Sequence, residues 1–392
     1  MFSYFVHFRI SSTLLFLSVV FVRSEQTEKV KLSIPIVNSL NLYTLNVGIG
    51  TPPTPHALGI ATGSANTFAG AFNPGTFQPT PSTTNLQKPF FIPYGYGNVT
   101  GTLLTETLTF TANENSLTLP NVTIGNVSKL VSHHSSSIQQ QGFDGFDGLL
   151  GLGLSSESYP RDAENIGELL TPTGIMYDRE VLEEVMFGIS FMPTRSAPDP
   201  NGLITFGGVN PNRFIGDLVW YPCSSYHTWD WKASISYGDA TLSETELRGS
   251  FDTSYTNSPA IPRYLFDKYV VSIPGAVWDD SWLELNPAGQ VNEYMLRIPR
   301  ASVAEMEDLC FSSGDRKWCL VPEAQLVPDG IVPNADPAYR YGYVSPVQTA
   351  DASQQNSTFV FGMKAMERFY VAFDLANYRI GLAETEWTNC TF

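Results

Sequence analysis

The most informative segment of the chain is Leu58-Gly59-Ile60-Ala61-Thr62-Gly63-Ser64-Ala65-Asn66-Thr67-Phe68. It follows a strand-like run at residues 42–53 that ends in Gly-Thr-Pro-Pro, a combination typical of a turn. Residues 71–89, farther along, are rich in Thr, Pro, Asn and Gln and contain few apolar residues, as surface connections do. The order of these segments indicates a strand that enters a loop and then leaves toward the surface.

The composition indicates a β-rich globular protein. The chain has 392 residues, of which 43% are hydrophobic and 15% charged, enough to bury one large core or two moderate ones. Glycine, proline and aromatic residues are frequent, whereas long helical periodicity is scarce. The 38 acidic residues outnumber the 22 basic ones and give a formal charge of -16, so we expect neither nucleic acid nor an anionic membrane surface as a partner.

The first 24 residues have the pattern of a secretory signal peptide. Arg9 precedes the apolar run at residues 13–22, and Ser24 is small enough to precede the cleavage point. This run is too short to span a bilayer comfortably, and no later stretch is long and apolar enough, so no membrane anchor is expected. We therefore expect a secreted, extracellular protein, and we expect it to be a monomer.

An extracellular location permits disulfide bonds and N-glycosylation. The even number of cysteines allows three pairings, of which Cys310 with Cys319 is the most local, and elimination then pairs Cys223 with Cys390. Five Asn-x-Ser/Thr sequons are candidate glycosylation sites: Asn98, Asn121, Asn126, Asn356 and Asn389. The sequence thus predicts a disulfide-bonded glycoprotein.

The opening stretch resembles the first active-site loop of the pepsin-like aspartic peptidases. That loop has the pattern hydrophobic-hydrophobic-Asp-Thr-Gly-Ser after a strand ending in Ile-Gly-Thr-Pro-Pro, and this chain matches it except that Ala61 stands at the catalytic aspartate. An altered second loop lies at residues 249–256, where Asp252 and Thr253 match the family pattern and Ser254 replaces its glycine. The resemblance thus places one dyad carboxyl group at Asp252 and none at position 61.

Other motifs extend this resemblance over nearly the whole chain after the signal peptide. Residues 149–151 and 358–363 resemble the hydrophobic-hydrophobic-Gly strands that pass under the two loops, and residues 369–383 resemble the family's carboxy-terminal hairpin. Residues 259–271 have apolar residues at helical spacing after a proline, where these proteins place a short helix.

The same resemblance implies a mainly β, pepsin-like acid protease fold of two lobes with a central cleft. The amino-terminal lobe would span residues 25–219 and the carboxy-terminal lobe residues 220–392. A flap hairpin near residues 90–103 alternates around glycines, with Tyr94 at the position of the tyrosine that leans over the cleft. The residues expected to line the flap and the floor of the cleft are Thr62, Gly63, Ser64, Tyr94, Gly95, Tyr96, Gly97, Asp252, Thr253 and Ser254.

Aspartic peptidases hydrolyse amides with two carboxyl groups held so close that they share one proton. The charged group acts as base toward a water and the neutral one as acid, so both are required. Ala61 leaves Asp252 without this partner, and we expect the side chain of Ser254 to force a backbone adjustment where glycine permits close approach. We therefore expect a non-catalytic pseudo-peptidase that binds a peptide or protein in the cleft.

Two other functions fit the same residues. One is a weak or specialised aspartic endopeptidase that uses Asp252 with an unidentified partner, and the other is a secreted structural, storage or inhibitor protein that uses its outer surface. Other chemistries are disfavoured, because the adjacent His133 and His134 lack the spacing of a zinc site and no Gly-x-Ser-x-Gly elbow or phosphate-binding loop is present. His56 is expected to be structural or exposed and Asp147 to be structural, and neither a metal nor a cofactor is expected.

Overall fold

The computed structural model describes residues 29–40, 42–71, 77–94, 97–132, 146–154, 171–256, 258–279, 296–332, 335–347 and 357–390. The predicted signal peptide, the flap residues Gly95 and Tyr96, and the sequon at Asn356 lie outside this set. Within it, no helix is both long enough and apolar enough to cross a bilayer.

Strands dominate the amino-terminal half, as the composition predicts. They are β1 (Leu32–Asn38), β2 (Tyr43–Ile49), β3 (Thr54–Ala61), β4 (Thr67–Ala69), β5 (Thr84–Tyr94), β6 (Gly97–Ala112), β7 (Asn115–Ser132) and β8 (Gly148–Gly151). In β1 and β2 buried side chains alternate with less buried ones, so each strand presents one face to the core. β5 and β6 form the predicted flap hairpin, which closes with the pair Tyr94 and Gly97.

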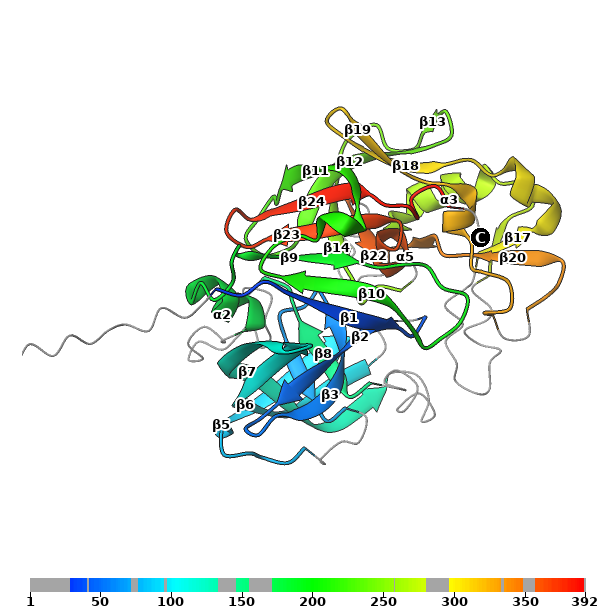
Figure 1. Cartoon of the computed structure of the whole chain (residues 1–392). Coiled ribbons are helices and arrows are strands. Elements are labelled where there is room, and N and C mark those ends of the chain that lie inside the picture. Colours follow the sequence, from blue (N-terminus) through cyan, green and yellow to red (C-terminus); the bar gives the residue numbers. More distant parts are fainter. Residues whose placement is uncertain are drawn as a thin grey trace, which may run out of the picture.

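A single sheet joins the two halves of the chain. It has thirteen strands in the order β11-β24-β23-β9-β10-β1-β2-β3-β8-β4-β7-β6-β5. Its later members are β9 (Met186–Ser190), β10 (Asp199–Phe206), β11 (Ile215–Pro222), β23 (Phe369–Asp374) and β24 (Arg379–Glu384). Figure 1 shows these strands stacked with β1 across the middle of the molecule, between the amino-terminal strands and the carboxy-terminal part. The predicted lobe boundary at residues 219 and 220 falls inside β11, a strand of this shared sheet.

The carboxy-terminal half adds two smaller sheets. An eight-stranded sheet has the order β19-β18-β12-β14-β22-β15-β21 with β13 beside β12, and a three-stranded sheet has the order β16-β17-β20. Their strands are β12 (Asp230–Tyr237), β13 (Ala240–Thr241), β14 (Leu247–Asp252), β15 (Ala260–Ile261), β16 (Val277–Trp278), β17 (Leu296–Pro299), β18 (Leu309–Ser313), β19 (Arg316–Leu320), β20 (Tyr339–Gly342), β21 (Ser345–Pro346) and β22 (Thr358–Gly362).

The helices of the described residues are short. They are α2 (Pro172–Asp178), α3 (Arg263–Val271) and α5 (Met363–Met366), with 3-10 turns η2 (Pro211–Arg213), η3 (Arg300–Glu305) and η4 (Pro322–Gln325). The helix predicted after Pro259 is α3, and its buried face consists of Leu265, Phe266 and Tyr269. It begins only at Arg263 because the two residues of β15 pair with neighbouring strands first.

The largest apolar cluster of the core extends from the amino-terminal strands into the carboxy-terminal half. Trp231 is fully buried within it, and its ring contacts those of Phe251, Phe359 and Phe361 at centroid distances of 5.7, 6.0 and 5.8 Å. Aromatic groups of this size contribute much of the apolar area that folding buries. Because Phe251 directly precedes Asp252, this packing fixes the end of β14.

The structure contains one of the two predicted disulfide bonds. Cys310 and Cys319 lie directly opposite each other in the β18–β19 hairpin and are bonded. The predicted pairing of Cys223 with Cys390 is wrong. Cys223 lies where β11 meets the start of β24, whereas Cys390 lies beyond the other end of β24, where its carbonyl accepts a hydrogen bond from Arg368. Pairing by elimination fails because the two cysteines are at opposite ends of one strand pair.

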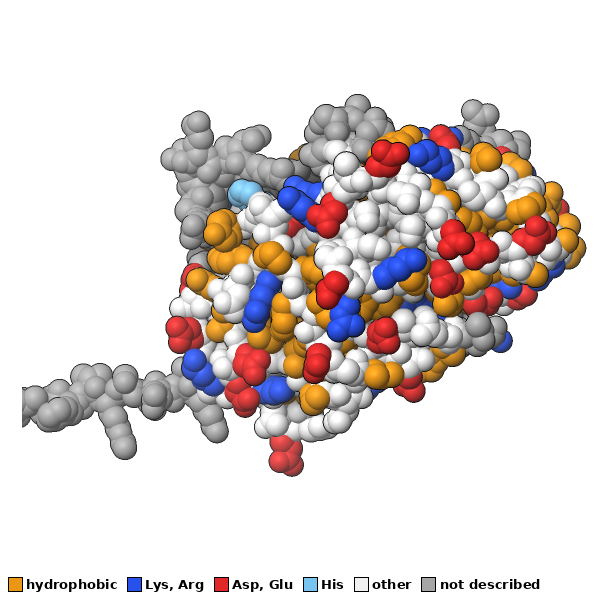
Figure 2. All heavy atoms as spheres, turned by 90° about the horizontal axis from the view of Figure 1, so that it is seen from above, with side chains coloured by type: hydrophobic (Ala, Val, Ile, Leu, Met, Phe, Trp, Pro, Cys, Tyr) orange, Lys and Arg blue, Asp and Glu red, His pale blue; other side chains and the backbone are white. Residues whose placement is uncertain are grey.

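The surface carries charges of both signs. Figure 2 shows acidic and basic side chains interspersed over the face that is seen from above. Among the predicted glycosylation sites, Asn121 and Asn389 are exposed, whereas the side-chain oxygen of Asn126 is buried. Glycosylation stays a prediction at each sequon.

Candidate active site

Each of the two loops begins at the end of a strand that a parallel strand supports. β3 ends at Ala61, which lies opposite Gly151 of β8, and the Ala61 carbonyl accepts a hydrogen bond from the Leu152 N–H. β14 ends at Asp252, which lies opposite Gly362 of β22 in the same parallel arrangement. The predicted support of both loops by hydrophobic-hydrophobic-Gly strands is thus confirmed.

Thr62 and Thr253 join the two loops by reciprocal hydrogen bonds. The Thr62 N–H donates to Thr253 Oγ1 over 3.0 Å, and the Thr253 N–H donates to Thr62 Oγ1 over 3.1 Å. Each hydroxyl then donates across the junction, from Thr62 to the Phe251 carbonyl at 2.8 Å and from Thr253 to the Ile60 carbonyl at 2.6 Å. Both threonines are buried, so these four bonds are shielded from water and hold the loops in a fixed relation.

This exchange of bonds relates the loops by an approximate two-fold axis. It equates residues 60–63 with residues 251–254, and therefore makes Ala61 the structural counterpart of Asp252. Ala61 has no exposed surface and belongs to an apolar cluster that also contains Leu42. Five of the predicted floor residues come together at the junction: Thr62, Gly63, Asp252, Thr253 and Ser254. The two equivalent positions, however, carry one carboxyl group and one methyl group.

Asp252 is partly exposed, and neutral groups supply its hydrogen bonds. The N–H and the hydroxyl of Ser254 donate to Oδ1 over 2.9 and 2.6 Å, and the Gly63 N–H also donates to the carboxyl group. Burial raises the pKa of Asp252, and the bonds from Ser254 and Gly63 offset only part of that rise. Within the described part of the chain, no charged group contributes to the shift. The like-charged neighbour that splits the proton affinities of a dyad is therefore not among the described residues.

Gly63 and Ser254 occupy equivalent places with different neighbours. A Cβ on Gly63 would lie 2.3 Å from Asp252 Cγ, so a larger residue cannot fit there without displacing the carboxyl group. By the two-fold relation, the Cβ of Ser254 corresponds to a Cβ on Gly63 and is expected to face the side chain at position 61, which here is a methyl group, while its hydroxyl bonds to Asp252. Ser254 keeps an ordinary negative φ, so the backbone adjustment expected at this position does not take it into a strained region.

Ser64 makes loop hydrogen bonds. Its hydroxyl accepts from the Asn66 N–H over 3.2 Å, and its carbonyl accepts from the Gly153 N–H over 2.9 Å. This serine therefore ties the first loop to the residues that follow β8, which is a structural role.

Phe68 connects the end of the first loop with the flap hairpin. It is fully buried, and its ring lies 6.0 Å from that of Phe90 on β5. Tyr94 pairs with Gly97 at the far end of the same hairpin. The contact of the Tyr94 side chain with the site stays a prediction.

One polar contact close to the first loop was not predicted. His56 Nδ1 lies 2.5 Å from Asp147 Oδ2, and the same oxygen accepts a hydrogen bond from the Gly70 N–H at 3.2 Å. The parallel pairing of Leu58 with Gly148 brings the two side chains together. The signal available in the sequence was the hydrophobic-hydrophobic-Gly motif, because its register on β3 places Asp147 beside His56.

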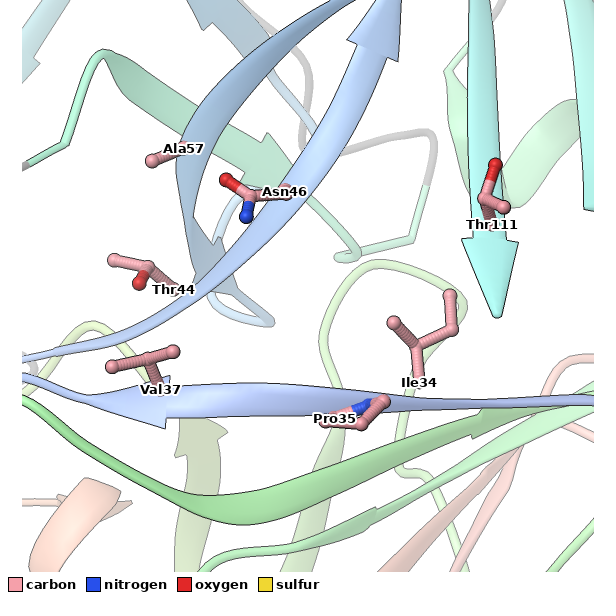
Figure 3. Close-up of a pocket in the computed structure, with 7 residues that line it drawn as sticks. All are labelled: Ile34, Pro35, Val37, Thr44, Asn46, Ala57 and Thr111. Carbon is pink, nitrogen blue, oxygen red and sulfur yellow. The ribbon is translucent and has the colours of Figure 1, made fainter. Parts of the chain in front are cut away.

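Two cavities lie away from the loop junction. One has a volume of about 380 Å³, and Figure 3 shows its lining side chains on β1, β2, β3 and β6: Ile34, Pro35, Val37, Thr44, Asn46, Ala57 and Thr111. The other, of about 180 Å³, is lined by Ile49, Thr54, His56, Gly70, Phe77, Gln78, Thr80 and Asp147. Neither includes Ala61 or Asp252. The candidate site is therefore located by its hydrogen bonds and its residues, and a ligand-sized cleft at the junction stays a prediction.

Comparison with known proteins agrees with this geometry. A family model described as eukaryotic aspartyl protease matches residues 42–385. The chain belongs to the eukaryotic aspartyl protease family. This aspartyl protease homologue is 30% identical to polyporopepsin of Irpex lacteus over 367 residues, which cover 92% of this chain and 98% of that protein. It is also 26% identical to cathepsin E of Aquarana catesbeiana, covering 89% of this chain and 81% of that protein.

The solved structure of an aspartic proteinase from Irpex lacteus has the same fold. It superposes on this aspartyl protease homologue with a TM-score of 0.78 at 28% sequence identity, covering 92% of this chain and 99% of that one. The predicted mainly β, pepsin-like fold is thus confirmed.

Proposed function

We propose that this aspartyl protease homologue is a non-catalytic pseudo-peptidase that binds a peptide or protein where its two loops meet. The observation that carries the proposal is the buried methyl group of Ala61 at the position equivalent to Asp252. The reaction of the family uses two carboxyl groups at these positions, and one remains. The intact Thr62–Thr253 junction supports a retained binding floor, because four buried hydrogen bonds still hold it.

A single carboxyl group cannot be both the base and the acid of amide hydrolysis. General acid–base catalysis by one group contributes typically about 10² to 10⁴ in rate, and loss of the second group also removes the positioning of the water. The two donors of Ser254 occupy both lone pairs of Asp252 Oδ1, which makes this oxygen a poor base. Both effects disfavour hydrolysis.

The relatives favour one alternative, a weak or specialised aspartic endopeptidase. Polyporopepsin and the aspartic proteinase of Irpex lacteus bear the names of enzymes. Such an activity would need a carboxyl group from outside the described residues to replace the one missing at Ala61. The third alternative is a secreted structural, storage or inhibitor protein. Such a protein would bind its partners through the outer surface and not at the loop junction.

A proteolysis assay tests the proposal. Purified protein is incubated with an unfolded protein substrate from acidic to neutral pH, beside Asp252→Ala and the matched surface variant Asp267→Ala. We expect no cleavage by the wild type above the level of Asp252→Ala. Pepstatin-sensitive cleavage that persists in Asp267→Ala and is lost in Asp252→Ala would establish the endopeptidase instead.

A binding assay tests whether the partner binds at the loop junction or on the outer surface. If a secreted peptide or protein binds at the loop junction, alanine substitutions at Tyr94 and Tyr96 on the flap are expected to weaken that binding. Unchanged binding in both variants would place the function on the outer surface. Secretion and a monomeric state belong to the same proposal. Recovery of the protein from the culture medium checks the first, and gel filtration of the recovered protein checks the second.

A further inference from the structure

The described residues supply the carboxyl group of Asp252 with hydrogen bonds but not with a counter-charge. Its donors are the N–H and hydroxyl of Ser254 and the N–H of Gly63, all neutral. Among the ion pairs of the described residues, none involves Asp252. Neutral donors stabilise a carboxylate without cancelling its charge, whereas charges withdrawn from water are normally paired.

The carboxyl group also has acceptor capacity left. A carboxylate offers about four lone-pair directions, two on each oxygen. Ser254 fills both directions on Oδ1, and the Gly63 N–H takes one more, so at least one direction remains. The counterpart position cannot fill it, because Ala61 is fully buried and has no polar side chain. Asp252 is partly exposed, so a group that approaches from outside can reach it.

A cationic donor suits this acceptor better than a neutral donor or a metal ion. A neutral donor adds only a hydrogen bond to the carboxylate, whereas an ammonium or guanidinium group adds a hydrogen bond and an opposite charge, which stabilises the charged form. The formal charge of -16 attracts cations to the protein as a whole. Divalent metals require several oxygen ligands, and the residues that could hold a metal in the described part of the chain do not include Asp252.

We propose that the ligand of the loop junction presents an ammonium or guanidinium group to Asp252, as a basic side chain or as the amino terminus of a peptide. This inference rests on the proposed function, because a second carboxyl group at the junction would change both its charge and its vacant acceptor direction. The inference restricts the expected ligands from peptides in general to peptides that present an ammonium or guanidinium group.

Three synthetic peptides of matched shape test the inference by calorimetry at neutral pH. The first is acetyl-Ala-Leu-Lys-Leu-Ala-amide, the second has norleucine in place of lysine, and the third is the norleucine peptide with a free amino terminus. The wild type is expected to bind one of the cationic peptides at least about tenfold more tightly than the uncharged one, because a charged hydrogen bond is gained. The stronger of the two identifies a side chain or an amino terminus as the source.

Two protein variants show whether the preference depends on Asp252. Asp252→Asn keeps the shape of the side chain and is expected to bind the charged and uncharged peptides equally, while the surface variant Asp267→Asn keeps the preference of the wild type. Equal affinity of the wild type for all three peptides, or a preference that survives in Asp252→Asn, would overturn the inference. Peptide cleavage, read by mass spectrometry in the same samples, would instead contradict the proposed function, so the two failures are distinguishable.

Discussion

Alanine at position 61, where the family pattern has an aspartate, is compatible with an intact hydrogen-bonded frame around it. The Ala61 carbonyl still accepts a hydrogen bond from the Leu152 N–H, and the neighbouring Thr62 still exchanges bonds with Thr253. The frame is made of backbone groups and threonine hydroxyls, whereas the reaction depends on the side chain at position 61. This division explains how the fold of an aspartyl protease can persist with alanine at position 61.

Substitutions at Ala61 and Ser254 are expected to be coupled in their effects on the free energy of unfolding. In Ala61→Asp the new carboxyl group would face Ser254 as Asp252 faces Gly63, where a Cβ would lie 2.3 Å from the carboxyl carbon. Ala61→Asp alone should therefore be destabilised, and adding Ser254→Gly should recover part of the loss. A double-mutant cycle of unfolding free energies is expected to show a coupling of about 0.5–3 kcal/mol, whereas additive effects would contradict the two-fold relation.

The double variant also tests what remains of the catalytic frame. Ala61→Asp with Ser254→Gly restores both motif residues that differ from the family pattern, and it is expected to regain some acid proteolysis that neither single variant shows. No activity in a well-folded double variant, checked by circular dichroism, would mean that other parts of the site have also diverged.

The charge of Asp252 is expected to make stability depend on pH. Burial raises its pKa, so the folded protein keeps this proton to a higher pH than the unfolded chain does. Stability therefore falls as pH rises from the ordinary carboxyl range to the raised value. Urea unfolding should find Asp252→Asn more stable relative to the wild type at neutral pH than at strongly acidic pH, where both states of the wild type are protonated. A difference independent of pH would contradict this assignment.

At the scale of elements, a buried ion pair ties α5 to the amino-terminal half. Lys364 and Glu367 are 2% and 5% exposed, and Lys364 Nζ lies 2.9 Å from Glu367 Oε1. The same oxygen accepts hydrogen bonds from Asn38 at the end of β1, over 3.1 Å, and from Tyr43 at the start of β2, over 3.2 Å. Burial and the charge of Glu367 raise the pKa of Tyr43 well above its usual value, so this hydroxyl stays protonated and can donate.

Removing only the cation of this pair is expected to lower the free energy of unfolding more than replacing both charged groups does. Lys364→Met leaves the Glu367 carboxylate buried without its cation, which typically costs about 3–5 kcal/mol. Adding Glu367→Gln removes the orphaned charge, so the double variant should be more stable than the sum of the singles predicts. Urea unfolding measures this, with Asp267→Ala as control, because the Arg263–Asp267 pair is 51% and 55% exposed and should contribute at most about 1 kcal/mol. Additive losses at Lys364 and Glu367 would contradict the coupling.

At the scale of the whole molecule, the thirteen-stranded sheet makes the two halves one structural unit. β23 and β24, near the end of the chain, pair with β9 and β11, and β10 continues the same sheet to β1 and β2. Trp229 adds a buried link, because its Nε1–H donates to the Leu152 carbonyl over 2.9 Å beside the first loop. Neither half can lose its strands without exposing apolar surface of the other.

The two halves are therefore expected to unfold in one transition. All seven tryptophans lie at or after position 220, so their fluorescence reports the carboxy-terminal half, whereas far-ultraviolet circular dichroism reports both halves. Thermal unfolding followed by the two probes should give coincident curves. A dichroism transition that precedes the fluorescence change would show that the amino-terminal strands unfold independently.

Features that depend on local pattern could be predicted from the sequence alone. The strand before Ala61, the flap hairpin and α3 follow from spacing and turn residues over a few positions, and the Cys310–Cys319 bond joins the two strands of one hairpin. The alanine at position 61, where the family pattern has an aspartate, is likewise a local feature, because a single residue shows it. The strand pattern and the motifs that match the family were also sufficient to predict the fold class.

Contacts between residues that are far apart in the chain could be established only from the assembled fold. The pairing of His56 with Asp147 and the failure of Cys223 to meet Cys390 depend on sheet register, which no single segment contains. The sequence shows Lys364 near Glu367, a spacing usually found on an exposed helical face, and only packing against β1 and β2 buries the pair. Whether two distant side chains meet, and whether a charged pair is buried, depends on which strands become neighbours in the assembled sheets.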